Sequence, residues 1–98
     1  MLLEVAQLKV KEGQSMAFEA AFREASPIIA SMVGYGGHEL QRCLEVQNRY
    51  LLLVRWGRLE DHTVGFRGSA GYQDWKNLLH HFYEPVSVVE HFETVDLG

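Results

Sequence analysis

Histidines are the side chains of this sequence that could perform acid–base chemistry near neutral pH, and one of the five lies in a distinctive string. His62 follows two acidic residues within the stretch Asp61-His62-Thr63-Val64-Gly65-Phe66-Arg67-Gly68-Ser69. A neutral imidazole titrates close to working pH, so His62 is a candidate general base that could remove a phenolic proton. The alternative interpretation is a histidine on the exposed surface of a helix.

Arg67 could supply positive charge to the same site. Gly65 and Gly68 flank it closely, so the backbone can bend there and direct the guanidinium inward. The planar fork of donors would suit a carboxylate or a developing phenolate. A solvent-facing arginine is the other interpretation of this position.

Aromatic side chains recur at helical spacing shortly after His62. Tyr72, Trp75 and Phe82 share one face of a predicted helix, and Phe66 precedes it. Such rings could hold a flat aromatic substrate. The same spacing is also typical of core packing by an amphipathic helix, and one helix can serve both purposes.

The other histidines give little support for a metal site. His80 and Glu84 lie four residues apart on one helical face, and His91 lies on the predicted last strand. Three histidines and a carboxylate could bind non-haem iron, but no His-Glu-x-x-His motif is present, and the adjacent His80 and His81 would point about 100° apart on a helix. We therefore expect no metal, and we expect His91 at an interface or at the rim of a substrate pocket.

Composition limits the classes of function. The 98 residues suffice for one domain, residues 1–98, with a single modest core. Nine Lys and Arg against 13 Asp and Glu give a net charge of −4, which speaks against nucleic acid or an anionic membrane as the main partner. No apolar run approaches the roughly 20 residues that span a bilayer. The start of the sequence lacks the features of a signal peptide, so a soluble cytoplasmic protein is expected.

The single cysteine, Cys43, excludes a disulfide within one chain and a structural zinc site built from cysteines. No histidine or other base stands at a recognisable offset from it. A buried or interface thiol is therefore the favoured interpretation over a nucleophile.

Hydropathy patterns predict which elements position these residues. Strands are expected over residues 2–10, 38–46, 50–56 and 86–95, and helical segments over 14–32, 59–66 and 69–83. Pro27 is expected to break the first helix and to start a second one after the cap residue Ser26. Gln47-Asn48 is the expected hairpin turn. The order β-α-β-β-α-β predicts an α+β, ferredoxin-like fold, with an antiparallel sheet and helices on one face only.

The predicted third strand is apolar on both faces. Leu51 and Leu53 alternate with Leu52 and Val54, so one set faces the helices and the other set needs a different cover. The simplest cover is a second copy of the chain, packed sheet against sheet. The pattern therefore predicts a homodimer.

These elements and several motifs resemble the antibiotic biosynthesis monooxygenase family. The motifs are Lys11-Glu12-Gly13 after the first strand, the bend Gly34-Tyr35-Gly36-Gly37, the strand Tyr50-Leu51-Leu52-Leu53-Val54-Arg55-Trp56, and Leu59-Glu60-Asp61-His62 after it. The resemblance covers nearly the whole chain. It implies a dimeric α+β barrel, with a pocket between the sheet and the helices of each subunit.

The first functional hypothesis from this resemblance is a cofactor-independent monooxygenase that acts on a small aromatic phenol or quinol. His62 would be the base and Arg67 the anion partner. The substrate would lie among Phe66, Tyr72, Trp75, Phe82 and His91. The second hypothesis is a non-catalytic dimeric module that uses the same pocket to hold an apolar ligand, since this fold is shared with ligand binders.

No cofactor is expected. The resemblance implies that haem-degrading relatives use an Asn on the first strand and a Trp and a His on later helices. Here the corresponding positions hold Ala6 or Gln7, Phe66 and Trp75. Flavin or nicotinamide binding would need a glycine-rich turn between a strand and a helix, and neither glycine cluster has that setting.

Overall fold

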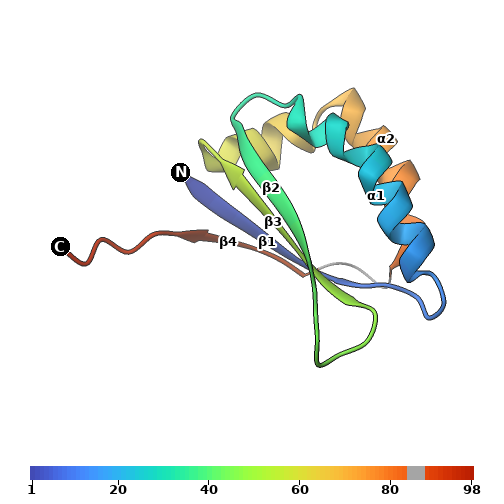
Figure 1. The fold of residues 1–98 in the computed structure, drawn as a ribbon. Coiled ribbons are helices and arrows are strands. Elements are labelled where there is room, and N and C mark those ends of the chain that lie inside the picture. Colours follow the sequence, from blue (N-terminus) through green and yellow to red (C-terminus); the bar gives the residue numbers. More distant parts are fainter. Residues whose placement is uncertain (84–87) are drawn as a thin grey trace.

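The computed structural model of this chain describes residues 1–83 and 88–98. Within these residues, four strands form one antiparallel sheet in the order β2-β3-β1-β4, and helices cover one of its faces (Figure 1). The predicted α+β class and the order β-α-β-β-α-β are confirmed. The elements are β1 (Leu2–Lys9), α1 (Ser15–Ala30), β2 (Tyr35–Arg42), β3 (Arg49–Trp56), the π-helix η1 (Asp61–Phe66), α2 (Ala70–Leu79), the 3₁₀ turn η2 (His80–Phe82) and β4 (Val88–Glu93).

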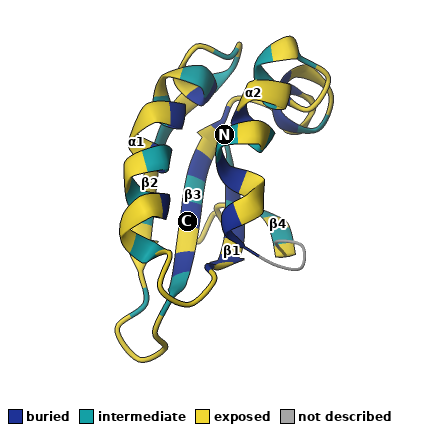
Figure 2. Cartoon of the chain, turned by 90° about the vertical axis from the view of Figure 1, so that its right-hand side faces the viewer, coloured by how far each residue is buried: buried dark blue, intermediate teal, exposed yellow. Residues whose placement is uncertain are grey.

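The hydrophobic core lies between the sheet and the helices (Figure 2). β1 and β3 pair antiparallel, with Leu2 opposite Trp56 and Lys9 opposite Arg49, so the even-numbered residues of both strands point to the same side. That side meets the apolar stripe of α1, whose spacing follows the helical period. The largest fully buried side chains are Trp56, Phe18, Ile29, Leu79 and Val54.

Pro27 does not break the first helix, contrary to the expectation. α1 runs without interruption from Ser15 to Ala30 and contains Pro27 in its last turn. A proline there removes only the hydrogen bond to the carbonyl of Arg23, which lies on an exposed residue and can be solvated. The hydroxyl of Ser26 donates to the carbonyl of Phe22 at 2.9 Å and does not cap a new helix.

The second strand begins and ends earlier than the 38–46 range expected for it. β2 starts at Tyr35, passes an irregularity before His38 and ends at Arg42. Residues 43–48 form the turn, closed by the bond from Cys43 N to Arg49 O at 2.8 Å. The left-handed backbone at Asn48 (φ 66°) confirms the conformation expected of it. Cys43 is half-buried in this turn, where its sulfur accepts the Val46 N–H.

The last three predicted elements are present with shorter bounds. The segment over 59–66 is a π-helix, η1, in which Arg67 N donates to His62 O across five residues. The hydroxyl of Ser69 accepts the Tyr72 N–H at 3.2 Å and begins α2. β4 covers Val88–Glu93. Residues 84–87, which include Glu84 and Pro85, lie outside the described residues.

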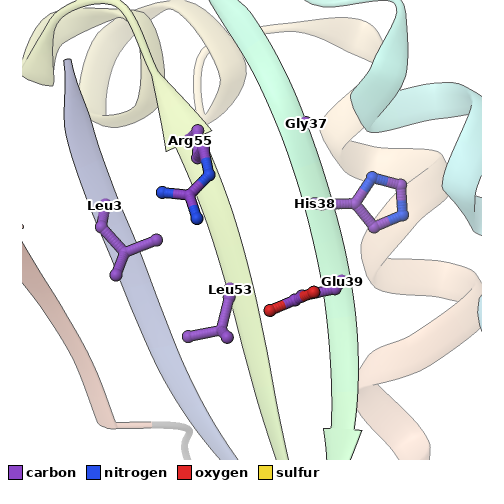
Figure 3. A pocket seen from close by; sticks show the side chains of 6 residues that line it. All are labelled: Leu3, Gly37, His38, Glu39, Leu53 and Arg55. Atoms are coloured by element: carbon purple, nitrogen blue, oxygen red, sulfur yellow. The ribbon is translucent and has the colours of Figure 1, made fainter.

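The face of the sheet opposite the helices carries apolar side chains from three strands, which we call the open-face patch: Leu3 and Val5 of β1, Leu51 and Leu53 of β3, and Val88 and Phe92 of β4. None of the helices of the described residues covers it (Figure 1). Leu3, Leu53, Glu39 and Arg55 line a shallow hollow of about 200 Å³ on this face. Figure 3 shows these side chains, and it shows His38 pointing toward the helices.

No helix in the ranges 1–83 and 88–98 is both long enough and apolar enough to cross a membrane.

Candidate functional site

A carboxyl group is buried in the core beside the end of β3. Glu4 lies on β1 at a position whose side chain points toward the helices, and only 5% of its surface is exposed. Its Oε1 accepts the indole N–H of Trp56 at 2.9 Å. Burial raises the pKa of Glu4, and the Trp56 hydrogen bond and the nearby charge of Arg67 oppose that rise. A buried carboxyl is unusual unless it is partnered, and the indole N–H of Trp56 is one partner here.

The π-helix η1 brings His62 to this carboxyl. His62 is 3% exposed, and its ring stacks on the Trp56 indole with a centroid distance of 5.5 Å and an interplanar angle of 16°. Its Nε2 lies 3.4 Å from Glu4 Oε1. The wide turn of η1 buries Asp61, His62 and Phe66 together. The interpretation of His62 as an exposed helix-surface residue is therefore wrong.

The strand β4 adds a second imidazole. His91 pairs with Glu4 across the β1–β4 ladder, so both side chains lie on the helix-covered face. His91 Nε2 lies 2.8 Å from His62 Nδ1, within hydrogen-bonding distance. Glu4, His62 and His91 thus form a continuous row, which we call the Glu4–His62–His91 triad. His91 is its half-buried, outermost member.

Both imidazoles of the triad are neutral at neutral pH. Burial, then the charge of Arg67, then His91 lower the pKa of His62 to about 4. Burial and Arg67 also lower the pKa of His91. A neutral imidazole pair can accept a proton from a bound substrate and can pass it between the two rings.

Arg67 lies just outside η1 with its side chain exposed. Its backbone N–H donates to the carbonyl of His62 at 3.1 Å, which ties the two residues together. Its charge acts on all three members of the triad. The exposed side chain agrees with the solvent-facing interpretation of Arg67, and its charge reaches the two histidines from the surface of the protein.

The predicted aromatic residues divide into two groups. The ring of Phe66 lies 6.3 Å from that of His62, 5.1 Å from that of Tyr72 and 5.6 Å from that of Trp75. Phe66 therefore adjoins the triad, and Tyr72 and Trp75 lie behind it, in contact with its ring. Phe82 instead packs against Phe18, at 6.0 Å, and is part of the general core. The structure does not bring Phe82 to His62.

His80 lies apart from the triad. Its ring contacts those of Tyr72 and Tyr83, at 6.1 Å and 5.5 Å. The expected pairing of His80 with Glu84 falls partly outside the described residues. Within residues 1–83 and 88–98, no group of three His, Cys, Asp or Glu side chains is arranged to hold a metal ion.

Sequence reasoning missed Glu4. The signal was present, because Glu4 occupies an inward position of a strand whose other inward residues include Ala6 and Leu8. A charge at such a position is expected to have a buried partner. Its partners, Trp56 and His62, come from distant parts of the chain, and their identity required the fold.

Comparisons with known proteins agree on one family. The family model described as antibiotic biosynthesis monooxygenase matches residues 1–78. The uncharacterized protein YczJ of Bacillus subtilis (strain 168) is 57% identical over 95 residues, which are 97% of this chain and 100% of that protein. A solved structure from Bordetella bronchiseptica that carries the family's name is 33% identical, with a TM-score of 0.93 over 96% of each chain. SnoaB, a cofactor-independent oxygenase from Streptomyces nogalater, has 20% identity and a TM-score of 0.79 over 97% of this chain and 93% of its own.

Proposed function

The chain belongs to the antibiotic biosynthesis monooxygenase family, and we propose that it is a cofactor-independent monooxygenase acting on a small aromatic phenol or quinol. The observation that carries this proposal is the hydrogen-bonded pair His62–His91, two neutral imidazoles with the ring of Phe66 beside that of His62. The ring of Tyr72 lies against the ring of Phe66. SnoaB, which shares the fold, is described as a cofactor-independent oxygenase. That description supports the choice of reaction class.

The proposed reaction begins with a proton transfer. The His62–His91 pair takes the proton of the substrate hydroxyl, which leaves an electron-rich phenolate. The phenolate reduces O₂ directly. One oxygen atom becomes the new carbonyl of the quinone, and the other leaves as water with the two hydrogens that the substrate loses. The protein contributes orientation, exclusion of water and stabilisation of the anion.

The remaining side chains have roles that follow from their positions. Arg67 stabilises the phenolate, because its charge already acts on both histidines. Phe66, Tyr72 and Trp75 provide flat surfaces for the substrate ring. Phe82 supports this wall through the core and makes no direct contact with the substrate.

The proposed working unit is a homodimer. The open-face patch places six apolar side chains on the surface of a single subunit, and Leu51, Val88 and Phe92 are 36%, 59% and 48% exposed. Charged residues at its margin, Glu39, Glu90 and Arg55, could pair across a two-fold axis. Burying this patch against a second copy would remove the apolar surface from water.

Oxygen uptake tests the proposed function. Purified protein is supplied with a panel of anthrols and quinols in air-saturated buffer that contains a chelator and no flavin. We expect substrate-dependent oxygen consumption and one atom of ¹⁸O in the quinone when ¹⁸O₂ is used. We expect His91→Gln and His62→Gln each to lower kcat/KM at least about 100-fold, the usual scale of a general base. His81→Gln, a change at an exposed histidine on η2, serves as the matched control.

Two outcomes would contradict the proposal. Tight binding of a panel member without oxygen uptake would indicate the non-catalytic ligand-binding module instead. Activity that disappears with the chelator and returns with added metal would indicate metal chemistry.

A further inference from the structure

We propose that Glu4 and Trp56 determine which nitrogens of the two histidines carry hydrogen, so that Nδ1 of His91 is the atom that receives the substrate proton. This inference rests on the proposed function, in which the His62–His91 pair is the base. Glu4 and Trp56 act through the histidines and are positioning residues. His91 is the member of the triad that would touch the substrate.

The order of donors begins at Trp56. An indole has one N–H and no acceptor, so the atom it contacts must offer a lone pair. That atom is Oε1 of Glu4, 2.9 Å from Trp56 Nε1. The statement holds in both protonation states of Glu4, because a neutral carboxyl can carry its hydrogen on Oε2.

The same oxygen determines the tautomer of His62. Nε2 of His62 faces Oε1 of Glu4 at 3.4 Å, and two lone pairs facing each other would repel. Nε2 therefore carries the hydrogen. The buried ring of His62 is neutral and has a single N–H, so its Nδ1 has a lone pair.

The tautomer of His62 in turn determines that of His91. The two rings share a hydrogen bond of 2.8 Å between His62 Nδ1 and His91 Nε2. Since Nδ1 of His62 is the acceptor, Nε2 of His91 is the donor. A neutral His91 then has a free lone pair on Nδ1.

His91 is more accessible from outside the protein than His62, as a histidine that receives the substrate proton must be. His62 is enclosed by Trp56 and Phe66 and is 3% exposed, whereas His91 is half-buried on the edge strand β4. A proton accepted at Nδ1 of His91 gives an imidazolium. That ring can then pass its Nε2 hydrogen to Nδ1 of His62. The other ring nitrogen of His62, Nε2, faces Glu4. Arg67 remains next to the substrate anion.

Nuclear magnetic resonance of the intact ¹⁵N-labelled protein at pH 7.5 tests the donor order without any substrate. The ring signals are assigned by their loss in His62→Gln and His91→Gln. We expect one proton with a one-bond coupling to His91 Nε2 and a coupling through the hydrogen bond to His62 Nδ1. We also expect an unprotonated Nδ1 on His91. A proton bonded to His62 Nδ1 or to His91 Nδ1, or no coupling between the two rings, would overturn the inference.

Two substitutions at Glu4 test its positioning role. Glu4→Gln keeps an oxygen that can face Trp56, so the donor order is expected to persist. Glu4→Leu removes the acceptor, and hydrogen is then expected on Nδ1 of His91 in part of the molecules. Trp56→Phe is a second test of the donor order, because loss of the indole N–H allows Oε1 of Glu4 to carry hydrogen. If folded Glu4→Leu keeps the same order of hydrogen-bond donors, Glu4 does not position the histidines.

Activity separates this inference from the proposed function. We expect Glu4→Leu to lower kcat about 10- to 100-fold, the range seen when a partner that orients a functional histidine is lost. Glu4→Gln should retain more of the activity, as the conservative variant. Absence of oxygen uptake in the wild type, together with the expected donor order, would contradict the function alone. Uptake that depends on His91, together with the reverse donor order, would contradict the inference alone.

Discussion

The carboxylate of Asp61 lies directly against the Cα of Gly34, so that a Cβ built on this glycine would overlap the carboxylate. Asp61 is 8% exposed and accepts the Arg58 N–H at 3.0 Å, which anchors the start of η1. Gly34 also has a φ of +82°, in the left-handed region that favours glycine. The bend before β2 and the helix that carries His62 therefore fit together only because residue 34 has no side chain.

Gly34→Ala is expected to destabilise the protein by more than about 3 kcal/mol, because left-handed strain and an overlap with a buried side chain add together. Gly13→Ala is the matched control. It has a similar φ of +78°, but nothing lies within 4 Å of its Cβ position. About 1–2 kcal/mol is expected there. Urea unfolding of both variants measures the difference, and equal losses would show that the contact with Asp61 is unimportant.

Acid is expected to weaken the fold through His62. Its pKa falls from the ordinary 6.5 to about 4 in the folded chain, so between these values the unfolded chain binds more protons. Stability from this group is fully present above pH 6.5 and is lost as the pH falls toward 4, by about 3 kcal/mol in total. Glu4 and His91 contact the ring from β1 and β4, and the charge of Arg67 acts on it from the end of η1.

The measurement is the free energy of unfolding at several pH values from 7 to 4. Glu4 opposes this trend, because its pKa is raised in the folded chain and its contribution to the free energy of unfolding therefore falls as the pH rises. The quantity to compare is thus the difference in free energy of unfolding between the wild type and each variant. His62→Gln should flatten the slope between pH 6.5 and 4. His81→Gln should retain the slope of the wild type. Equal slopes in all three proteins would contradict the assignment.

Leu53→Asp is expected to abolish the proposed dimer while the subunit stays folded. Leu53 lies in the open-face patch, so a carboxylate there would be buried without a partner only in the dimer, at a cost of several kcal/mol. Light scattering at micromolar concentration should give twice 11.2 kDa for the wild type and 11.2 kDa for the variant. Leu44→Asp, at a leucine that is 90% exposed in the turn before β3, is the control. A wild type that is monomeric, or a dimer unaffected by Leu53→Asp, would exclude this interface.

Ser69→Ala is expected to cost about 1 kcal/mol of stability, the usual value of a helix N-cap. The hydroxyl of Ser69 accepts the Tyr72 N–H at 3.2 Å at the start of α2. Ser31→Ala is the comparison, since the Ser31 hydroxyl donates to a carbonyl at the end of α1 and satisfies no free N–H. Thermal unfolding of both variants distinguishes the loss of a helix cap from the loss of any surface hydroxyl. Equal shifts of the unfolding midpoint in the two variants would contradict the capping role.

The sequence by itself determined the order of the elements, because each depends on a local pattern. The alternation in β1, the continuous apolar run of β3, the apolar stripe of α1 and the turn at Asn48 can all be read from neighbouring residues. The local pattern was misleading at Pro27. Its ring removes one hydrogen bond near a helix end, and the packing of α1 on the sheet outweighs that loss.

Only the tertiary structure decided the composition of the candidate site. His62 and Phe66 come from one local string, and the sequence analysis named both as candidate site residues, as it did His91. The partners of His62 depend on strand pairing, which places His91 of β4 opposite Glu4 of β1, and on the end of β3, which provides Trp56. Glu4 and His91 lie near opposite ends of the sequence and Trp56 lies between them, so no local periodicity relates the three. The register of the sheet therefore converts an isolated histidine into a triad with a defined order of donors.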